Sequence, residues 1–87
     1  MPTLEDKFAQ AQKDVNDLPE RPDNDTLLKL YACFKQARQG DATGERPGGF
    51  DFLKRAKFDA WCALKGTSTQ DAMEQYVALV SFYAAKL

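Results

Sequence analysis

Two groups of cationic and aromatic residues occur in the sequence at spacings that place each group on one helix face. In the first group, Tyr31 and Lys35 are one helical turn apart, and Phe34 lies next to them. The second group comprises Lys54, Arg55, Lys57 and, one turn later, Trp61. Ammonium groups bind phosphate and aromatic rings stack on bases, so two such helices together suit a phosphorylated aromatic group such as a nucleotide. The alternative is that the rings are core residues and the lysines a solvated face, and spacing alone leaves both open.

The residue types that most enzymes use are missing or isolated. The chain has no histidine, which removes Ser-His-Asp and Cys-His catalysis and the commonest zinc sites. Cys33 and Cys62 have no Cys or His neighbour that would complete a metal site, so we expect two free thiols on buried or half-buried side chains. Asp59 is an isolated helical carboxylate, and Glu45-Arg46 is expected to pin its loop through an ion pair. We therefore predict no catalytic residue, no metal and no cofactor.

Charge is distributed unevenly along the chain. The 87 residues carry 12 Lys and Arg against 13 Asp and Glu, a formal net charge of −1, so no overall positive field attracts nucleic acid. Residues 29–65 hold eight basic residues and four acids, whereas residues 1–28 hold three basic residues and seven acids. This pattern favours a local anion-binding site in the middle of the chain.

Helices must position these residues, because apolar residues recur at helical spacing in four stretches. Pro19 ends the first stretch, and Gly40 suits the end of the second. Residues 23–25 can cap the second helix, and Ser68, with Asp71 three positions later, can cap the fourth. The first stretch has its apolar positions from Leu4 to Leu18, and the second opens at residues 23–25 and stops at Gly40. The third runs from about Phe52 or Lys54 to Lys65, and the fourth starts with Ser68 as its cap and has apolar positions as far as Ala84.

The fold class predicted from these stretches is all-α, a four-helix bundle in one domain over residues 1–87. The short connections at 19–22 and 66–68 favour antiparallel neighbours for the first and second helices and for the third and fourth. The long connection at 40–51 acts as a crossover, which lets the second and third helices run in the same direction.

The same residues carry a resemblance to the acyl-CoA-binding protein family. It extends from about Phe8 to Tyr83 with closely similar spacing, and it implies an up-down-down-up four-helix bundle. The motifs that carry it are YACFKQARQGD (31–41), ERPG (45–48), AKFDAW (56–61), LKGTS (64–68), DAM (71–73) and Tyr76.

The resemblance also implies a binding site for coenzyme A and its acyl tail. Tyr31, Lys35 and Lys57 match the family's contacts to the ribose 3′-phosphate and the adenine region. Tyr76 matches a further ligand-contacting tyrosine on the last helix. Two positions differ from the family: Phe34 replaces a tyrosine near the adenine, and Asn16 replaces a lysine that reaches the phosphates. Lys13, three residues before Asn16, is a cation that would partly compensate for the missing lysine.

The function that follows is binding of medium- to long-chain fatty acyl-CoA by an intracellular carrier that maintains a pool of this ligand. The chain starts without the basic and apolar regions of a signal peptide, so we expect a cytoplasmic protein. We expect a monomer, because each helix is polar opposite its apolar stripe and a small bundle of this kind has no evident second apolar face. Contacts with membranes or enzymes are expected only transiently, for ligand delivery. Two alternatives are a non-catalytic helical protein-interaction module and an enzyme acting on acyl-CoA, which would need a base or nucleophile beside the thioester.

Overall fold

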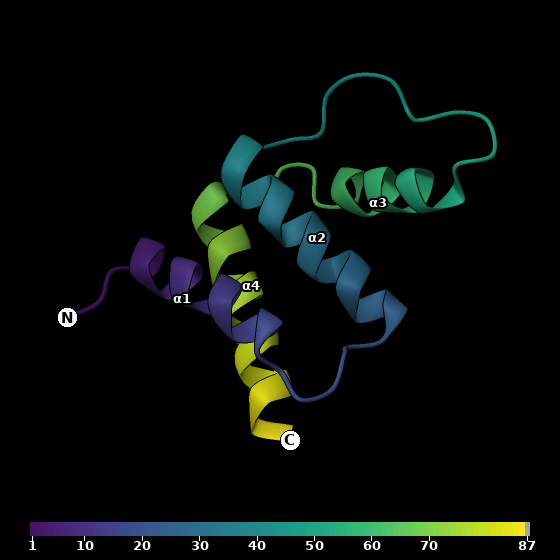
Figure 1. Cartoon of the computed structure of the whole chain (residues 1–87). Helices are drawn as coiled ribbons and strands as arrows, with labels where there is room; N and C mark the ends of the chain where they lie inside the picture. The colour runs from purple at the N-terminus through teal and green to yellow at the C-terminus, as the bar shows by residue number, and fades with distance from the viewer. Residues whose placement is uncertain (87) are drawn as a thin grey trace.

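The computed structural model describes residues 1–86 and consists of four helices joined by three connections (Figure 1). This part of the chain contains no strand, which confirms the all-α prediction. The helices are α1 (Leu4–Asn16), α2 (Asn24–Gln39), α3 (Phe52–Cys62) and α4 (Thr69–Lys86).

Side chains cap the helices where the sequence predicts helix starts. An Asp23 carboxylate oxygen accepts the backbone N–H of Thr26 at 2.9 Å at the start of α2. The Ser68 hydroxyl oxygen accepts the N–H of Asp71 at 3.0 Å at the start of α4. Gly40 ends α2 with φ of +77°, a left-handed conformation that glycine adopts without strain. Local sequence therefore determines these helix ends.

Two helices end earlier than predicted. The first ends at Asn16 and not at Leu18, and the third ends at Cys62 and not at Lys65. In both places the backbone tightens into bonds three residues apart, which close the last turn of the helix. At the end of α1, the Asp17 N–H donates to the Asp14 carbonyl at 3.0 Å. At the end of α3, the Leu64 N–H donates to the Trp61 carbonyl at 3.0 Å.

Helix packing differs from the predicted pairing. Helix α2 packs against both α3 and α4, and α1 packs against α4. The prediction that α1 pairs closely with α2, and α3 with α4, is therefore wrong. A short connection limits the distance between two helix ends but does not make the helices pack along their length, so these two pairs diverge. The prediction that α2 and α3 run in the same direction is confirmed, and both run from right to left in Figure 1.

The core lies where α1, α2 and α4 meet. Helix α3 is attached mainly through Trp61, whose indole N–H donates to the Gly40 carbonyl at 2.8 Å. The buried cluster consists of Phe8, Ala11, Leu30, Cys33, Ala37, Ala72, Tyr76 and Val80.

A buried polar network joins the end of α2 to the connection between α3 and α4. The Gln36 side-chain amide, which has no exposed surface, donates to the Asp41 carboxylate and to the Thr67 carbonyl, both at 2.8 Å. Asp41 also accepts the backbone N–H of Gly66 at 2.8 Å. That backbone bond, together with the one from Gln36, lowers the pKa of Asp41. The network fixes the end of α3 relative to α2.

The long connection is held to α3 by an ion pair. Two guanidinium nitrogens of Arg46 donate to the two oxygens of Asp59 at 2.8 and 2.7 Å. The expected ion pair of this loop is thus formed by Arg46 with Asp59, and these hydrogen bonds lower the pKa of the Asp59 carboxyl. None of the described helices is long and apolar enough to cross a membrane.

Candidate ligand-binding site

The two predicted groups of residues meet along the contact between α2 and α3, which we call the α2–α3 seam. Because the two helices run in the same direction, Tyr31 faces Lys57 and Lys35 faces Trp61. The Lys57 ammonium lies 5.2 Å from the centre of the Tyr31 ring, and the Lys35 ammonium lies 4.9 Å from that of the Trp61 ring. Each helix thus supplies one cation and one ring, and each cation rests on the ring of the other helix.

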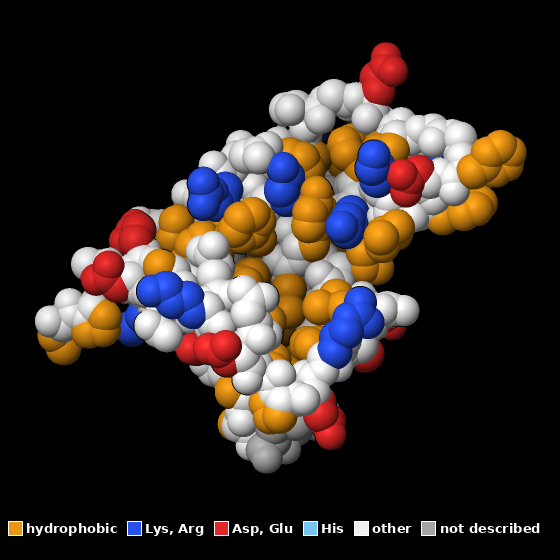
Figure 2. Space-filling view, viewed as in Figure 1, with side chains coloured by type: hydrophobic (Ala, Val, Ile, Leu, Met, Phe, Trp, Pro, Cys, Tyr) orange, Lys and Arg blue, Asp and Glu red, His pale blue; other side chains and the backbone are white. Residues whose placement is uncertain are grey.

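Neither lysine is neutralised by an acid. Within the described part of the chain, carboxylates pair with Arg46 and Lys54, but none pairs with Lys35 or Lys57. Both lysine side chains are half-buried along the seam. Figure 2 shows several Lys and Arg side chains bordering apolar surface over α2 and α3. The seam can therefore bind an anion without first breaking an ion pair.

An open groove lies beside the seam between the diverging helices α1 and α2. This α1–α2 groove has a volume of about 550 Å³, and Tyr31 and Phe34 form part of its wall. It combines apolar surface with a few polar groups, as ligand sites commonly do. Its lining residues are Gln12, Val15, Asn16, Arg21, Pro22, Leu27, Leu30, Tyr31, Phe34 and Tyr76.

A second groove continues from the first across Tyr31 toward the start of α3. This α2–α3 groove has a volume of about 670 Å³, and it shares Arg21, Leu27 and Tyr31 with the α1–α2 groove. Arg21 and Lys57 are the two cations among its lining residues, which otherwise are mostly apolar. The remaining lining residues are Asn24, Leu28, Phe52 and Leu53.

Tyr76 and Phe34 form the inner wall of the α1–α2 groove. Tyr76 is only 5% exposed, and its ring packs edge-on against Phe8 with centroids 5.1 Å apart. Burial, with a smaller effect of Cys33, raises the pKa of Tyr76, so its hydroxyl stays protonated near neutral pH. Phe34 is half-buried, and the Arg38 guanidinium lies 5.5 Å from its ring centre. Tyr76 is thus chiefly a core residue, whereas Phe34 offers more of its ring.

The two α1 residues expected near the phosphates lie in different surroundings. Asn16 lines the α1–α2 groove, and its side-chain amide donates to the Gln12 carbonyl at 3.1 Å. Lys13 is exposed and is not part of the groove wall, which α1 builds from Gln12, Val15 and Asn16. The structure therefore places Asn16, Tyr31, Phe34 and Tyr76 in the wall of the α1–α2 groove and Lys57 with Tyr31 in that of the α2–α3 groove. Lys35 lies at the seam beside Trp61 and lines neither groove, and Lys13 lies outside the site.

Sequence reasoning missed Arg21. This cation precedes Pro22 in the connection between α1 and α2, and it lines both grooves. It belongs to residues 1–28, whose three basic residues against seven acids do not indicate an anion-binding site. The available signal was its position next to a proline, which fixes the path of the connection.

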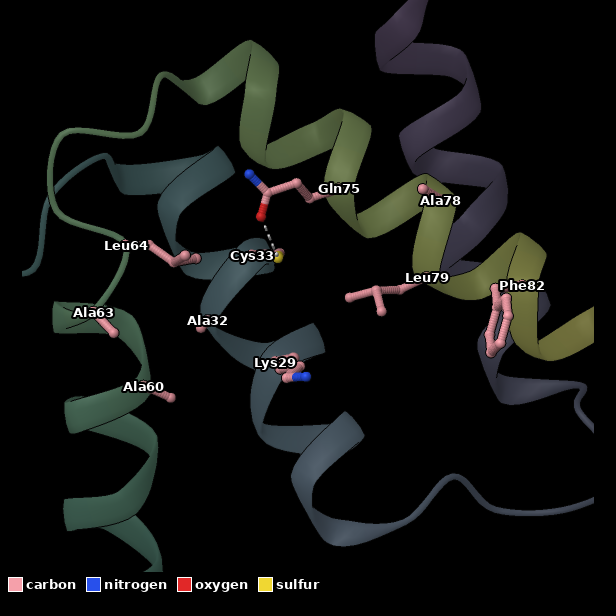
Figure 3. A pocket seen from close by; sticks show the side chains of 10 residues that line it. All are labelled: Lys29, Ala32, Cys33, Ala60, Ala63, Leu64, Gln75, Ala78, Leu79 and Phe82. Carbon is pink, nitrogen blue, oxygen red and sulfur yellow. Dashed lines mark hydrogen bonds between the residues drawn. The ribbon is translucent and has the colours of Figure 1, made fainter.

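A third cavity lies on the other side of α2, between the diverging helices α3 and α4 (Figure 3). This α3–α4 cavity has a volume of about 640 Å³ and is almost entirely apolar, with Lys29 as its only cation. Cys33 donates a weak hydrogen bond to the Gln75 side-chain oxygen at 3.8 Å across its wall. Without a second cation it is poorly suited to phosphate. Its lining comprises Lys29, Ala32, Cys33, Ala60, Ala63, Leu64, Gln75, Ala78, Leu79 and Phe82.

The cysteines differ from the sequence expectation in one respect. Both are free thiols, as predicted, and Cys33 is buried. Cys62 is exposed, because it lies on the last turn of α3, which packs against α2 alone among the other helices. Within residues 1–86, no group of three or more Cys, Asp or Glu side chains is arranged to hold a metal ion.

The family model described as "Acyl CoA binding protein" matches residues 5–80 of this chain. The acyl-CoA-binding protein of Saccharomyces cerevisiae is 48% identical over 79 residues, which cover 91% of each chain. The acyl-CoA-binding protein homolog 1 of Caenorhabditis elegans is also 48% identical over 79 residues, 91% of this chain and 92% of its own.

Solved structures agree with these sequence relatives. The crystal structure of Oryza sativa acyl-CoA-binding protein 2 superposes with a TM-score of 0.91 at 34% identity, covering 97% of this chain and 93% of the rice chain. The solution structure of the yeast acyl-coenzyme A binding protein superposes with a TM-score of 0.71 at 48% identity, covering 91% and 92%.

Proposed function

The chain belongs to the acyl-CoA-binding protein family, and from this premise we propose that it binds medium- to long-chain fatty acyl-CoA and carries it within the cell. One observation supports this most directly. Two half-buried ammonium groups without acidic partners lie on aromatic rings along the α2–α3 seam, beside grooves lined by apolar residues. Coenzyme A thioesters combine the two chemistries that this arrangement matches: a phosphorylated nucleotide and a hydrocarbon chain.

The polar part of the ligand belongs at the seam. Lys35 and Lys57 donate to the ribose 3′-phosphate, and the Tyr31 hydroxyl adds a third donor. Phe34 presents a ring to the adenine but lacks a hydroxyl that would hydrogen-bond it. Arg21, which lines both grooves, is placed to interact with a further phosphate.

The acyl chain belongs in the α2–α3 groove. Leu27, Leu28, Phe52 and Leu53 supply its apolar lining. Burial of each methylene contributes about 0.8 kcal/mol, so the chain supplies affinity while the head group supplies specificity. A free fatty acid would leave the seam cations without a partner and is expected to bind weakly.

We also propose that the protein is a non-catalytic, cofactor-free monomer of the cytoplasm. The residues that line the two grooves include no Asp, Glu or Cys, and hence no carboxylate or thiol to attack or deprotonate a bound thioester. This supports a carrier over an acyl-CoA enzyme.

Calorimetric titration with palmitoyl-CoA tests the proposal, with palmitate as the control ligand. We expect one palmitoyl-CoA bound per chain, weak or undetectable palmitate binding, and intact thioester recovered afterwards by mass spectrometry. Absence of binding would overturn the proposed ligand. Hydrolysis or transfer of the acyl group at catalytic rates would overturn the assignment as a carrier.

A further inference from the structure

Large hydrophobic side chains are exposed together where the long connection enters α3. Phe50 is 93% exposed, Phe52 68% and Leu53 62%, and we call these three residues the α3 tip. The other large hydrophobic residues described as exposed, Met1 and Phe82, lie elsewhere in the chain. Figure 2 shows hydrophobic side chains projecting at the end of the molecule where α3 begins. Single exposed hydrophobic residues are common on protein surfaces, whereas several large ones grouped together mark an interaction surface.

The α3 tip is held in a defined conformation. The Phe52 N–H donates to the Phe50 carbonyl at 3.0 Å, and Asp51 caps α3 by accepting the N–H of Lys54 at 3.1 Å. Gly49, with φ of +71°, makes the turn that directs Phe50 outward. The core attachment of α3, Trp61, lies at the opposite end of the helix. The exposed rings therefore contribute nothing to the core, and their position is fixed by local hydrogen bonds.

Basic side chains follow the tip directly. Lys54 is exposed, and its only carboxylate contact among the described residues is a 3.7 Å pair with the capping Asp51. Arg55 follows, and Lys57 and Arg21 line the adjoining groove. Aromatic and leucine side chains bordered by Lys and Arg are typical of segments that sit at the interface of an anionic bilayer. The net charge of −1 gives the whole molecule no general attraction to such a surface, so binding has to be local.

The tip is continuous with the site described above. Phe52 and Leu53 belong to the tip and also line the α2–α3 groove. We propose that the α3 tip docks this protein on an anionic phospholipid bilayer, with Phe50 inserted among the lipids and Lys54 at the head groups. This rests on the proposed function in one respect: docking at the tip brings Phe52 and Leu53, which line the acyl groove, to the bilayer, so an acyl chain can enter along these side chains.

Vesicle co-sedimentation of the full chain tests the docking. The probes are vesicles of phosphatidylcholine with about one-third phosphatidylserine, and vesicles of phosphatidylcholine alone, both without acyl-CoA. We expect wild type to partition onto the anionic vesicles and much less onto the neutral ones. Phe50→Ser and Lys54→Gln should each reduce this partitioning several-fold, to about a tenth for Phe50→Ser. Phe82→Ser removes an exposed ring remote from the tip and should stay within about twofold of wild type.

The outcomes separate this inference from the proposed function. Phe50 and Lys54 line neither groove, so both variants should bind palmitoyl-CoA in solution as wild type does. Equal partitioning of wild type and Phe50→Ser would overturn the docking inference while leaving palmitoyl-CoA binding intact. Self-association that Phe50→Ser abolishes, without vesicle binding by wild type, would overturn it in favour of a contact between copies. Vesicle binding by a protein that fails to bind palmitoyl-CoA would uphold the docking and refute the ligand.

Discussion

At the scale of single residues, the positions of Lys35 and Lys57 explain how the seam is ready for an anion. Each ammonium lies over the ring of the facing helix, about 5 Å from its centre, and this contact restricts a side chain that is otherwise mobile. Restriction before binding reduces the conformational entropy lost when the phosphate arrives. The same rings remain available as apolar neighbours once the ligand is bound.

We predict that Lys35→Ala and Lys57→Ala each weaken palmitoyl-CoA binding through loss of a phosphate contact. Hydrogen bonds to charged groups contribute about 1.5–3 kcal/mol, less where solvent screens them, so a loss of roughly tenfold to a hundredfold is expected by calorimetry. The loss should largely vanish with the dephospho-CoA ester, because that ligand lacks the 3′-phosphate. Lys13→Ala, on exposed α1 surface, is the control and should change affinity little. Equal affinity of wild type for both esters would contradict the phosphate contact.

The two thiols should differ in reactivity. Cys62 is exposed, whereas Cys33 is buried and burial raises the pKa of its thiol, so little of it is thiolate. With a chromogenic disulfide reagent, we expect one thiol to react promptly and the other about tenfold or more slowly. Cys62→Ser should remove the fast phase, and denaturant should expose Cys33. Equal rates for both thiols in the folded protein would show that Cys33 is accessible.

At the scale of the helices, the Asp41 network sets how α3 is fixed to α2. The Gly66 N–H and then the Gln36 amide lower the pKa of Asp41 in the folded protein. A carboxyl with a lowered folded pKa stabilises the fold above its unfolded pKa of about 4, and this contribution is lost as pH falls through the folded pKa. Asp59, whose pKa Arg46 lowers, acts in the same direction.

We therefore predict that Asp41→Asn makes stability less dependent on acid pH. Urea midpoints of wild type should fall as pH decreases below about 4, and those of the variant should be lower at neutral pH and fall less. Glu45→Gln changes an exposed carboxyl of the same loop and serves as the control. Parallel pH curves for wild type and Asp41→Asn would contradict a stabilising role for this carboxylate.

Capping residues and periodicity were enough to predict the four helices, because helix starts depend on side chains within one turn. Close pairing of α1 with α2 and of α3 with α4 was wrong, because packing depends on contacts remote in sequence, such as Phe8 against Tyr76.

For the site, the one-turn spacings of Tyr31 with Lys35 and of Lys57 with Trp61 indicated the two sides of the seam, although not that each lysine lies on the ring of the other helix. Arg21 could not be inferred in the same way, because its place depends on the path of an irregular connection.

At the scale of the whole molecule, two of the cavities lie where short connections join helices that diverge. The α1–α2 groove and the α3–α4 cavity both occur at such pairs, on opposite sides of the central contact between α2 and α4. The molecule is correspondingly flat, with extents of 42 × 27 × 15 Å. In so small a chain, diverging helices provide open grooves without requiring an enclosed cavity.

The close helix pairs also form a series, α3 with α2, α2 with α4, and α4 with α1, so α1 and α3 each pack closely along only one other helix of the described chain. Local opening of these two helices should therefore require less free energy than opening of α2 or α4.

A ligand that touches Asn16 of α1, Tyr31 of α2 and Lys57 of α3 would link both ends of the series to its centre. Native-state hydrogen exchange should show α1 and α3 amides exchanging fastest without ligand and slowed most by palmitoyl-CoA. Uniform slowing in all four helices would instead indicate that the chain opens only as one cooperative unit.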